Sequence, residues 1–219
     1  MKKCLIPAFL YFSSLTASPT SVFWTDCTTS CQPEDSALIN LTSFSKRGTY
    51  DVGLLVGLFS WKGITSEGGV DYVVGSKRPF YLNGKIAIDE EKLFTHSPSC
   101  SIGLFNVGTS RKTNQAVVDA VFGTTLPYEL GTFSAGVYRG RHTLGKKRSG
   151  WMVGYQKTFG DRWQLSCDYA SGKNAIGGGG VALTYFFTPK TSLQTGPIWF
   201  NDASFYGKWR WSFQLNMAI

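Results

Sequence analysis

The chain has little of what a helical membrane protein or a metalloenzyme needs. Beyond the N-terminal stretch it lacks any run of about 18 apolar residues, which excludes a transmembrane helix as the main architecture. Histidine is scarce, with only His96 and His142. His142 lies in a basic stretch without a nearby carboxylate, and the serines beside His96 would point to the other face of a strand. We therefore expect no catalysis, no metal and no cofactor.

The N-terminus is typical of an export signal. Lys2 and Lys3 precede the apolar stretch Cys4 to Ala17, which is too short to span a bilayer and is followed by small residues. We expect a cleavable signal peptide over residues 1–21, with cleavage between 17 and 21. Residues 22–36 would then form a short N-terminal segment, and residues 37–219 a single domain.

Cysteine is also sparse, and an exported chain places it in an oxidising compartment. Cys27 and Cys31 are close enough in sequence to form a small disulfide, whereas the chain offers them no further ligands with metal-site spacing. We expect a disulfide between these two cysteines in preference to a metal site.

Instead, the chain has segments in which apolar and polar residues strictly alternate, and turn residues separate these segments. From Trp209 to Ile219 every second residue is apolar, and the residues between them are polar or small. The same pattern recurs around Trp163 and Trp151, with only Gly160-Asp161 between those two segments. A mean hydropathy of -0.08, with 15% aromatic residues and 25 glycines, suits strands that face lipid on one side and a polar lumen on the other.

The strand count follows from these segments and their connections. Eleven alternating segments are visible from Tyr50 onward, and a weaker one at Ala37 to Phe44 makes twelve. Connections alternate between short turns and longer loops, the usual layout of an outer-membrane barrel. Asp89 to Ser99 is long for the short-turn side, which leaves ten or fourteen strands open. We predict an all-β, antiparallel up-and-down transmembrane barrel of about 12 strands.

Aromatic residues gather near the predicted strand ends, as expected at membrane interfaces. They are Trp61, Tyr81, Trp151, Phe159, Trp163, Phe187, Trp199 and Trp209. A soluble β-sandwich or lipocalin-like barrel, the alternative, would use its aromatics in a core and would not place them at segment ends.

The stretch from Trp163 to Asp202, WQLSCDYASGKNAIGGGGVALTYFFTPKTSLQTGPIWFND, resembles bacterial outer-membrane β-barrel proteins of a porin-like type. The resemblance lies in a D-Y-x-x-G-K-N segment that leads to a glycine-rich strand, an aromatic strand end, a short polar turn and another strand. It implies location in the bacterial outer membrane and insertion by the outer-membrane assembly machinery. Many such barrels end in Phe or Trp, whereas this chain ends in Ile219.

Charged residues at lumen-facing positions are the first candidate functional set. Alternation places Asp51, Asp71, Lys85, Asp119, Asp168 and Arg210 inside the barrel. They could line a narrow pore and tune its ion selectivity, or they could pair with one another and plug it. Alternation alone does not separate these two interpretations.

Basic residues on the longer loops are the second candidate set. The chain carries 22 basic and 14 acidic residues, a net charge of +8. The candidates for binding anions or glycans are Arg139, Arg141, Lys146, Lys147 and Arg148, with His142, Arg111, Lys112 and Lys173 nearby. An exported basic chain meets lipopolysaccharide phosphates or sulfated glycans, and we expect no nucleic-acid partner. A merely solvated loop remains the simpler interpretation for any single residue.

Two functions follow from the sequence. The first is a narrow porin-like channel for the passive passage of small solutes or ions, which requires an open lumen. The second is a non-channel surface protein, an adhesin or a structural protein, that binds anionic glycans or lipopolysaccharide through the basic loops.

Overall fold

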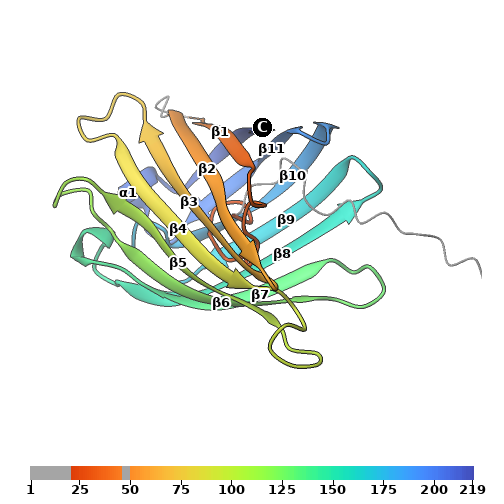
Figure 1. Cartoon of the computed structure of the whole chain (residues 1–219). Helices are drawn as coiled ribbons and strands as arrows, with labels where there is room; N and C mark the ends of the chain where they lie inside the picture. Colours follow the sequence, from red (N-terminus) through yellow and green to blue (C-terminus); the bar gives the residue numbers. More distant parts are fainter. Residues whose placement is uncertain (1–20, 46–49) are drawn as a thin grey trace, which may run out of the picture.

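The computed structural model describes residues 21–45 and 50–219. The expected signal peptide lies almost wholly outside these residues. The described chain forms twelve β-strands that close into one antiparallel barrel, with each strand beside its sequence neighbours and β1 paired with β12. The tilted strands curve around a common interior (Figure 1). The strand number of twelve and the up-and-down order are therefore confirmed.

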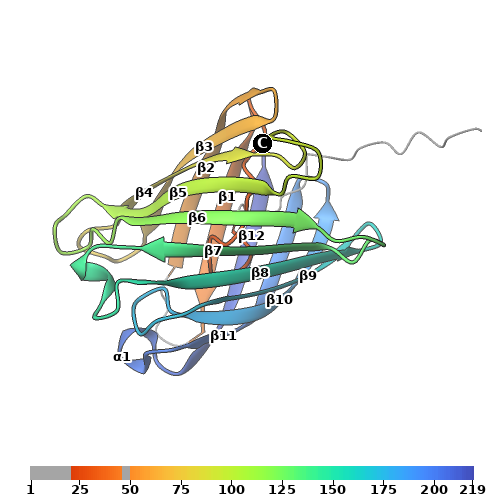
Figure 2. The same cartoon turned by 90° about the horizontal axis from the view of Figure 1, so that it is seen from below.

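The twelve strands have similar lengths and run side by side in sequence order around the barrel (Figure 2). They are β1 Ala37–Phe44, β2 Tyr50–Trp61, β3 Ile64–Val73, β4 Phe80–Ile88, β5 Ser99–Gly108, β6 Val117–Thr125, β7 Thr132–Arg139, β8 Ser149–Phe159, β9 Trp163–Ala170, β10 Gly178–Thr188, β11 Thr191–Phe200 and β12 Trp209–Ala218. A 3-10 turn, η1 (His142–Leu144), and a single helical turn, α1 (Ala203–Tyr206), lie in two of the connections. Within the described residues, neither helix has the length and apolar character needed to cross a membrane.

The connections differ between the two ends of the barrel. One end, here called the turn end, carries the connections 62–63, 89–98, 126–131, 160–162 and 189–190, together with the C-terminus. The other, here called the loop end, carries the connections 74–79, 109–116, 140–148, 171–177 and 201–208, together with the end of β1 at Phe44 and the start of β2 at Tyr50. The two-residue turn 62–63 has positive φ at both Lys62 (51°) and Gly63 (82°), as a type I′ hairpin requires. The long connection 89–98 is a loop and contains no further strand.

The barrel closes between its first and last strands. Seven residue pairs join β1 to β12, from Leu38 opposite Ala218 to Phe44 opposite Ser212. Ala37 and Ile219 exchange backbone hydrogen bonds of 3.1 and 2.9 Å at the turn end. The weak N-terminal strand expected at Ala37 to Phe44 therefore provides the partner that leaves no free sheet edge.

The outer face of the barrel is apolar and uncovered by any described element. Large hydrophobic side chains such as Ile102 (66% exposed) and Val137 (60% exposed) point away from the barrel in the middle of their strands. A soluble sandwich would bury this face under a second layer. Aromatic side chains gather near both ends, with Trp61 and Trp163 at the turn end and Trp151 at the loop end.

One aromatic residue differs from the expectation. Tyr81 lies between the exposed side chains of Phe80 and Leu82, so strand alternation turns it into the lumen. It does not belong to the outer aromatic girdle.

Candidate functional site

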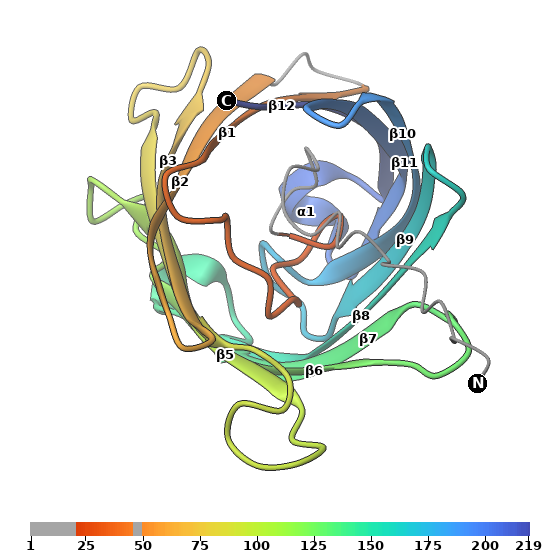
Figure 3. The same cartoon turned by 45° about the vertical axis from the view of Figure 1, so that its right-hand side comes forward.

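The lumen contains the chain's own N-terminal segment. Residues 21–36, here called the inner segment, run inside the ring of strands before joining β1 (Figure 3). Val22, Phe23 and Cys27 are at most 3% exposed. Hydrogen bonds and ion pairs join the inner segment to eight strands, β2, β3, β4, β5, β7, β9, β11 and β12.

The first anchor of the inner segment is Asp168 on β9. Its Oδ2 accepts hydrogen bonds from three consecutive backbone N–H groups, those of Phe23 (3.1 Å), Trp24 (2.8 Å) and Thr25 (2.6 Å). The Thr25 hydroxyl donates a fourth, at 3.0 Å. Hydrogen bonds to an ionised acceptor are shorter and stronger than neutral ones. A single carboxylate thus fixes the start of the segment.

The second anchor is Lys85 on β4. Its Nζ lies 3.0 Å from Asp26 Oδ1 and 3.5 Å from Glu67 Oε1, and it donates to the Ser30 carbonyl at 3.2 Å. Glu67 in turn accepts the backbone N–H of Gln32 at 2.9 Å. Burial raises the pKa of Asp26 to about 7, and the ammonium of Lys85 opposes that rise. The middle of the inner segment is therefore held by charge.

The charges of this second anchor belong to a row across β3 to β6. Glu67 pairs in register with Lys85, Lys85 with Gly103, and Gly103 with Asp119. Asp119 accepts the backbone N–H of Gly103 at 2.7 Å. We call Glu67, Lys85 and Asp119 the charged row.

The wall of β9 to β12 and β1 is chemically different. Register pairs Gln164 with Thr184, Thr184 with Gln194, Gln194 with Gln214, and Gln214 with Thr42. We call these five residues the uncharged belt, because amide and hydroxyl groups follow one another over five neighbouring strands. The Gln194 Nε2 donates to the Val22 carbonyl (2.9 Å) and the Gln214 Nε2 to the Phe23 carbonyl (3.2 Å).

Glycines in the wall give the inner segment room. A Cβ added at Gly154 of β8 would lie 2.7 Å from the Cys27 carbonyl oxygen and 2.7 Å from Val22 Cγ2. A Cβ at Gly180 of β10 would lie 2.7 Å from the ring of Phe23. Close approach of another backbone or ring is a common reason for glycine within a strand. The wall is shaped to the segment as well as bonded to it.

Aromatic side chains surround Trp24 where the inner segment approaches the loop end. Its ring makes edge contacts with Phe44, Phe200 and Tyr206, at centroid distances of 6.4, 5.1 and 5.8 Å. The indole Nε1 donates to the Ile176 carbonyl at 2.9 Å. We call Phe44, Phe200 and Tyr206 the aromatic cage. It lies on β1, on β11 and on α1, and approaches the uncharged belt at Phe44, two residues beyond Thr42 on β1.

A cavity of about 460 Å³ lies on the turn-end side of the inner segment. Its lining includes Thr28 and Thr29 of the segment, Ser99 and Ser134 of the wall, and Glu90 of the connection 89–98. The lumen is therefore hollow at this end and occupied by the segment further in.

Several solved structures with a similar fold are named porins or an outer-membrane channel. The KdgM porin matches with a TM-score of 0.56 at 10% identity, over 84% of this chain and 97% of that one. The NanC porin matches with a TM-score of 0.55 at 9% identity, over 83% and 98%. An outer-membrane channel from Pseudomonas putida F1 matches with a TM-score of 0.56 at 9% identity, over 87% and 98%. The chain has a porin fold. No protein-family model matches the sequence, and no curated protein is significantly similar to it.

The six lumen candidates from the sequence all face the interior of the porin fold. Asp168 and Lys85 hold the inner segment, and Asp119 belongs to the charged row. Asp51 lies near Asp71, which accepts a hydrogen bond from Asn83 Nδ2 at 2.6 Å. Arg210 donates from Nε to the carbonyl of Tyr206 at 2.8 Å. These residues neither form one continuous lining nor pair mainly with one another, because the inner segment lies among them.

Sequence reasoning missed Glu67 and the inner segment itself. Glu67 lies in β3, which begins at Ile64, whereas alternation in the sequence becomes visible only from Val70. The inner segment has no strand periodicity that would place it inside the barrel. The available signal was its composition, since apolar Val22-Phe23-Trp24 directly follows the expected export signal.

The expected disulfide between Cys27 and Cys31 is absent from the structure, where both residues are free thiols. The reason is that they face different parts of the wall. Cys27 packs in a cluster with Val22, Val117 and Met152, whereas the Cys31 thiol points to the Thr65 carbonyl of β3 at 3.9 Å. Burial raises the pKa of the Cys27 thiol to about 12 and that of Cys31 to about 11.

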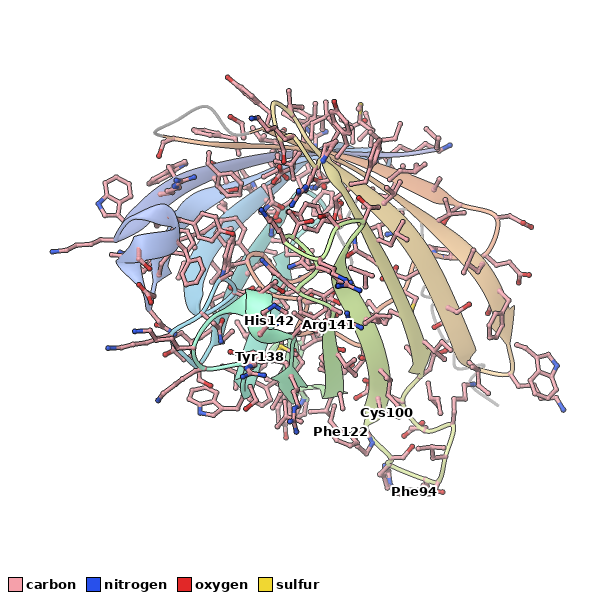
Figure 4. The ribbon with its side chains drawn as sticks, turned by 90° about the vertical axis from the view of Figure 1, so that its left-hand side faces the viewer. Phe94, Cys100, Phe122, Tyr138, Arg141 and His142 are labelled. Atoms are coloured by element: carbon pink, nitrogen blue, oxygen red, sulfur yellow. The ribbon has the colours of Figure 1, made fainter. Side chains whose placement is uncertain are left out.

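The basic candidates lie at the loop end. Arg139 ends β7, Arg141 and His142 lie at the start of the connection 140–148 (Figure 4), and Lys146, Lys147 and Arg148 complete it. All six side chains are exposed. The described loop-end connections carry ten basic residues and one acid, Asp202, whereas the turn-end connections carry four basic residues and five acids. The ten are Lys77, Arg78, Arg111, Lys112, Arg141, Lys146, Lys147, Arg148, Lys173 and Lys208.

Proposed function

We propose that the protein is a narrow channel of the bacterial outer membrane, through which small solutes or ions pass passively. The observation that carries this proposal is the closed ring of twelve strands, apolar on the outside and polar on the inside. Such a ring is stable only when lipid surrounds it and an aqueous or polar interior fills it. The porin fold of the neighbouring structures supports the same role.

The chemistry of the interior argues against a preference for anions. One structural neighbour is the KdgM porin in complex with disordered oligogalacturonate, a negatively charged sugar chain. In this chain, the buried and half-buried charged side chains described in the lumen are six carboxyl groups and two cations. The carboxyl groups belong to Asp26, Asp51, Glu67, Asp71, Asp119 and Asp168, and the cations are Lys85 and Arg210. An interior rich in carboxylates repels anions, so we expect cations or uncharged solutes to pass.

Electrical recording in a planar bilayer tests the channel. Refolded mature protein should give small, discrete current steps because the inner segment narrows the lumen. A variant with a loosened anchor, Lys85→Met, should give larger steps in the same bilayer. Heat-modifiable migration on a gel would confirm that both proteins have folded barrels. Folded barrels that remain silent in both forms would reject the channel.

We infer that transport involves no catalytic step. Of the two histidines, His142 is exposed at the loop end, and His96 Nδ1 lies 3.5 Å from Glu91 Oε1 on the exposed connection 89–98. Neither approaches a nucleophilic side chain in a cavity, which is what hydrolysis would need. Within the described residues, no group of three His, Cys, Asp or Glu residues could hold a metal ion.

The charge difference between the two ends favours a second candidate function. Ten cations against one acid at the loop end would bind lipopolysaccharide phosphates or sulfated glycans outside the barrel, in a non-channel surface protein. Replacing Lys146, Lys147 and Arg148 with Ser should then weaken binding to lipopolysaccharide. The matched control replaces Lys62, Lys92 and Lys190 with Ser at the turn end, which removes the same charge. Equal losses in both variants would indicate only a general charge effect.

Insertion into the membrane would depend on the C-terminal strand. β12 presents Phe213, Leu215 and Met217 on one face and ends next to Ile219. The outer-membrane assembly machinery is the partner that this strand would engage. An Ile219→Phe variant should insert at least as well as the parent.

A further inference from the structure

We propose that the uncharged belt and the aromatic cage form a binding track for an uncharged, hydroxyl-rich solute, such as a small neutral sugar. In this structure the inner segment occupies that track. The inference rests on the proposed channel function and gives it a substrate class. It starts from two neighbouring features of the lumen. Five amide and hydroxyl side chains stand in register with one another, and three aromatic rings lie on their loop-end side.

The contacts of the inner segment show which chemistry the track accepts. The amides of Gln194 and Gln214 donate to two backbone carbonyl oxygens, at 2.9 and 3.2 Å. A sugar hydroxyl offers an acceptor of the same kind. The aromatic cage holds the apolar ring of Trp24, and the C–H face of a sugar ring offers a similar apolar surface. The backbone carbonyl oxygens therefore occupy the places that sugar hydroxyls would take, and the indole of Trp24 occupies the place of the C–H face of a sugar ring.

Further hydrogen-bonding groups on the same wall are left without partners. Among the described residues, six buried polar atoms on this wall lack a hydrogen-bond partner: Gln164 Oε1, Ser166 Oγ, Asp168 Oδ1, Thr184 Oγ1, Gln194 Oε1 and Asn216 Nδ2. Their side chains are at most 9% exposed. Buried polar groups are normally paired, because leaving them unpaired costs free energy. The inner segment thus uses only part of what the wall offers, and a solute with many hydroxyl groups would use more.

The absence of charge on the belt selects against charged solutes. A carboxylate or ammonium moved into the lumen loses hydration, and only an opposite charge compensates for that loss. The belt offers none at its five positions. The nearest cation along β12, Arg210, already binds the carbonyl and ring of Tyr206. An uncharged polyol or sugar pays no such penalty and can still pair with amides and hydroxyls.

Because solute and inner segment would share one track, they compete for it. Binding of the solute should lift the inner segment from the wall and expose Cys27, which is fully buried while the segment is docked. Burial also raises the pKa of this thiol to about 12, which leaves it unreactive in place. Cys27 is therefore a built-in reporter of displacement.

The experiment measures the rate at which maleimide labels Cys27 in full-length mature protein in detergent, with Cys31, Cys100 and Cys167 replaced by Ser. Sucrose should raise the labelling rate about tenfold, which corresponds to the free energy of one to two neutral hydrogen bonds. The anionic sugar glucuronate should leave the labelling rate unchanged. Excluded osmolytes favour compact states, so a nonspecific effect of sucrose would have the opposite sign. A rate unchanged by sucrose, or raised equally by glucuronate, would overturn the proposal.

A variant of the uncharged belt and a matched control test whether the effect of sucrose on Cys27 labelling arises at the belt. Gln194→Leu with Gln214→Leu should abolish the sucrose-induced increase, expressed as the ratio of rates with and without sugar. Gln156→Leu changes the same residue type on β8, outside the belt, and should keep the ratio. Heat-modifiable migration checks folding in each case. A ratio retained in the belt variant would also overturn the proposal.

Bilayer recording separates this inference from the channel function. A conducting channel whose Cys27 labelling ignores sucrose would reject the track and keep the channel. Sucrose-dependent labelling in a barrel that conducts nothing would reject the channel and keep a sugar-binding site in the lumen.

Discussion

The two walls of the lumen hold the same inner segment by different means. The charged row on β3 to β6 is separated from the uncharged belt on β9 to β1 by β7 and β8 on one side and by β2 on the other. Lys85 of the charged row binds one side chain and one carbonyl of the segment, whereas the belt binds two backbone carbonyls through neutral amides. The charged row therefore contributes strong contacts and the belt two weaker ones, while Asp168, next to the belt on β9, adds a charged anchor of its own.

This difference suggests a division of roles. A buried ion pair is costly to break, because separating its partners leaves uncompensated charges. A neutral hydrogen bond contributes only about 1 kcal/mol, since water can replace the partner. The charged row should decide whether the inner segment is docked, and the uncharged belt should exchange partners easily, as a solute path must.

The largest effect is expected from the charged row. Lys85→Met would leave the carboxyl groups of Asp26 and Glu67 buried without their shared cation, at a cost of about 3 to 5 kcal/mol. The inner segment should leave the lumen, and Cys27 should label more than about a hundredfold faster. Lys190→Met, at an exposed turn, serves as the control and should change nothing. If the inner segment of Lys85→Met remained docked, the belt and the wall glycines would be enough to hold it in the lumen.

The second effect concerns Asp168, the one acidic anchor next to the belt. Asp168→Asn keeps the size of the side chain but removes the charge that four hydrogen bonds share. Bonds to a charged group are worth about 1.5 to 3 kcal/mol and neutral ones about 1, so we expect a loss of about 3 kcal/mol and labelling of Cys27 about a hundredfold faster. Asp161→Asn, on the exposed turn between β8 and β9, is the control. If Asp168→Asn raised the labelling rate of Cys27 less than a belt variant does, the proposed division of roles would be wrong.

The sequence predicted the barrel because alternation is a local property. Every second residue from Trp209 to Ile219 is apolar, and the structure exposes Trp209, Trp211 and Phe213 on the outside of β12. The same rule placed Lys85 and Asp168 inside. At Tyr81 a different expectation was wrong, namely that an aromatic residue near a strand end belongs to the outer girdle. Its two exposed neighbours set the inward orientation, as alternation requires.

Rules that use only neighbouring residues could not predict the position of the inner segment, because its partners are remote in sequence. The hydrogen bond from Phe23 to Asp168 spans 145 residues, and the one from Gln214 to Phe23 spans 191. Glu67 was missed for a related reason, since Gly68 and Gly69 interrupt the alternation of β3 beside it. Only the register between strands brings Glu67 opposite Lys85. Pairings of this kind depend on closure of the whole ring.

A third prediction concerns β8, which belongs to neither wall. Gly154→Ala would place a Cβ 2.7 Å from both the Cys27 carbonyl oxygen and Val22 Cγ2. Overpacking of this kind costs about 1 to 3 kcal/mol, which should raise Cys27 labelling about tenfold. Gly84→Ala on β4 is the matched control, because its nearest neighbour, the Glu67 carbonyl oxygen, would lie at an ordinary 3.6 Å. Equal effects of the two substitutions would indicate that loss of glycine in a strand matters more than the fit of the segment.

The smallest effect is expected from a single belt residue. Gln194→Leu removes one neutral hydrogen bond to the Val22 carbonyl and also removes the unpartnered Oε1, which cost free energy in the docked state. The two changes oppose each other, so Cys27 labelling without sugar should change by less than about tenfold. Gln156→Leu provides the baseline for the same substitution outside the belt. A change as large as that of Lys85→Met would show that the belt anchors the segment as strongly as the charged row, and the proposed ease of exchange along the belt would then be wrong.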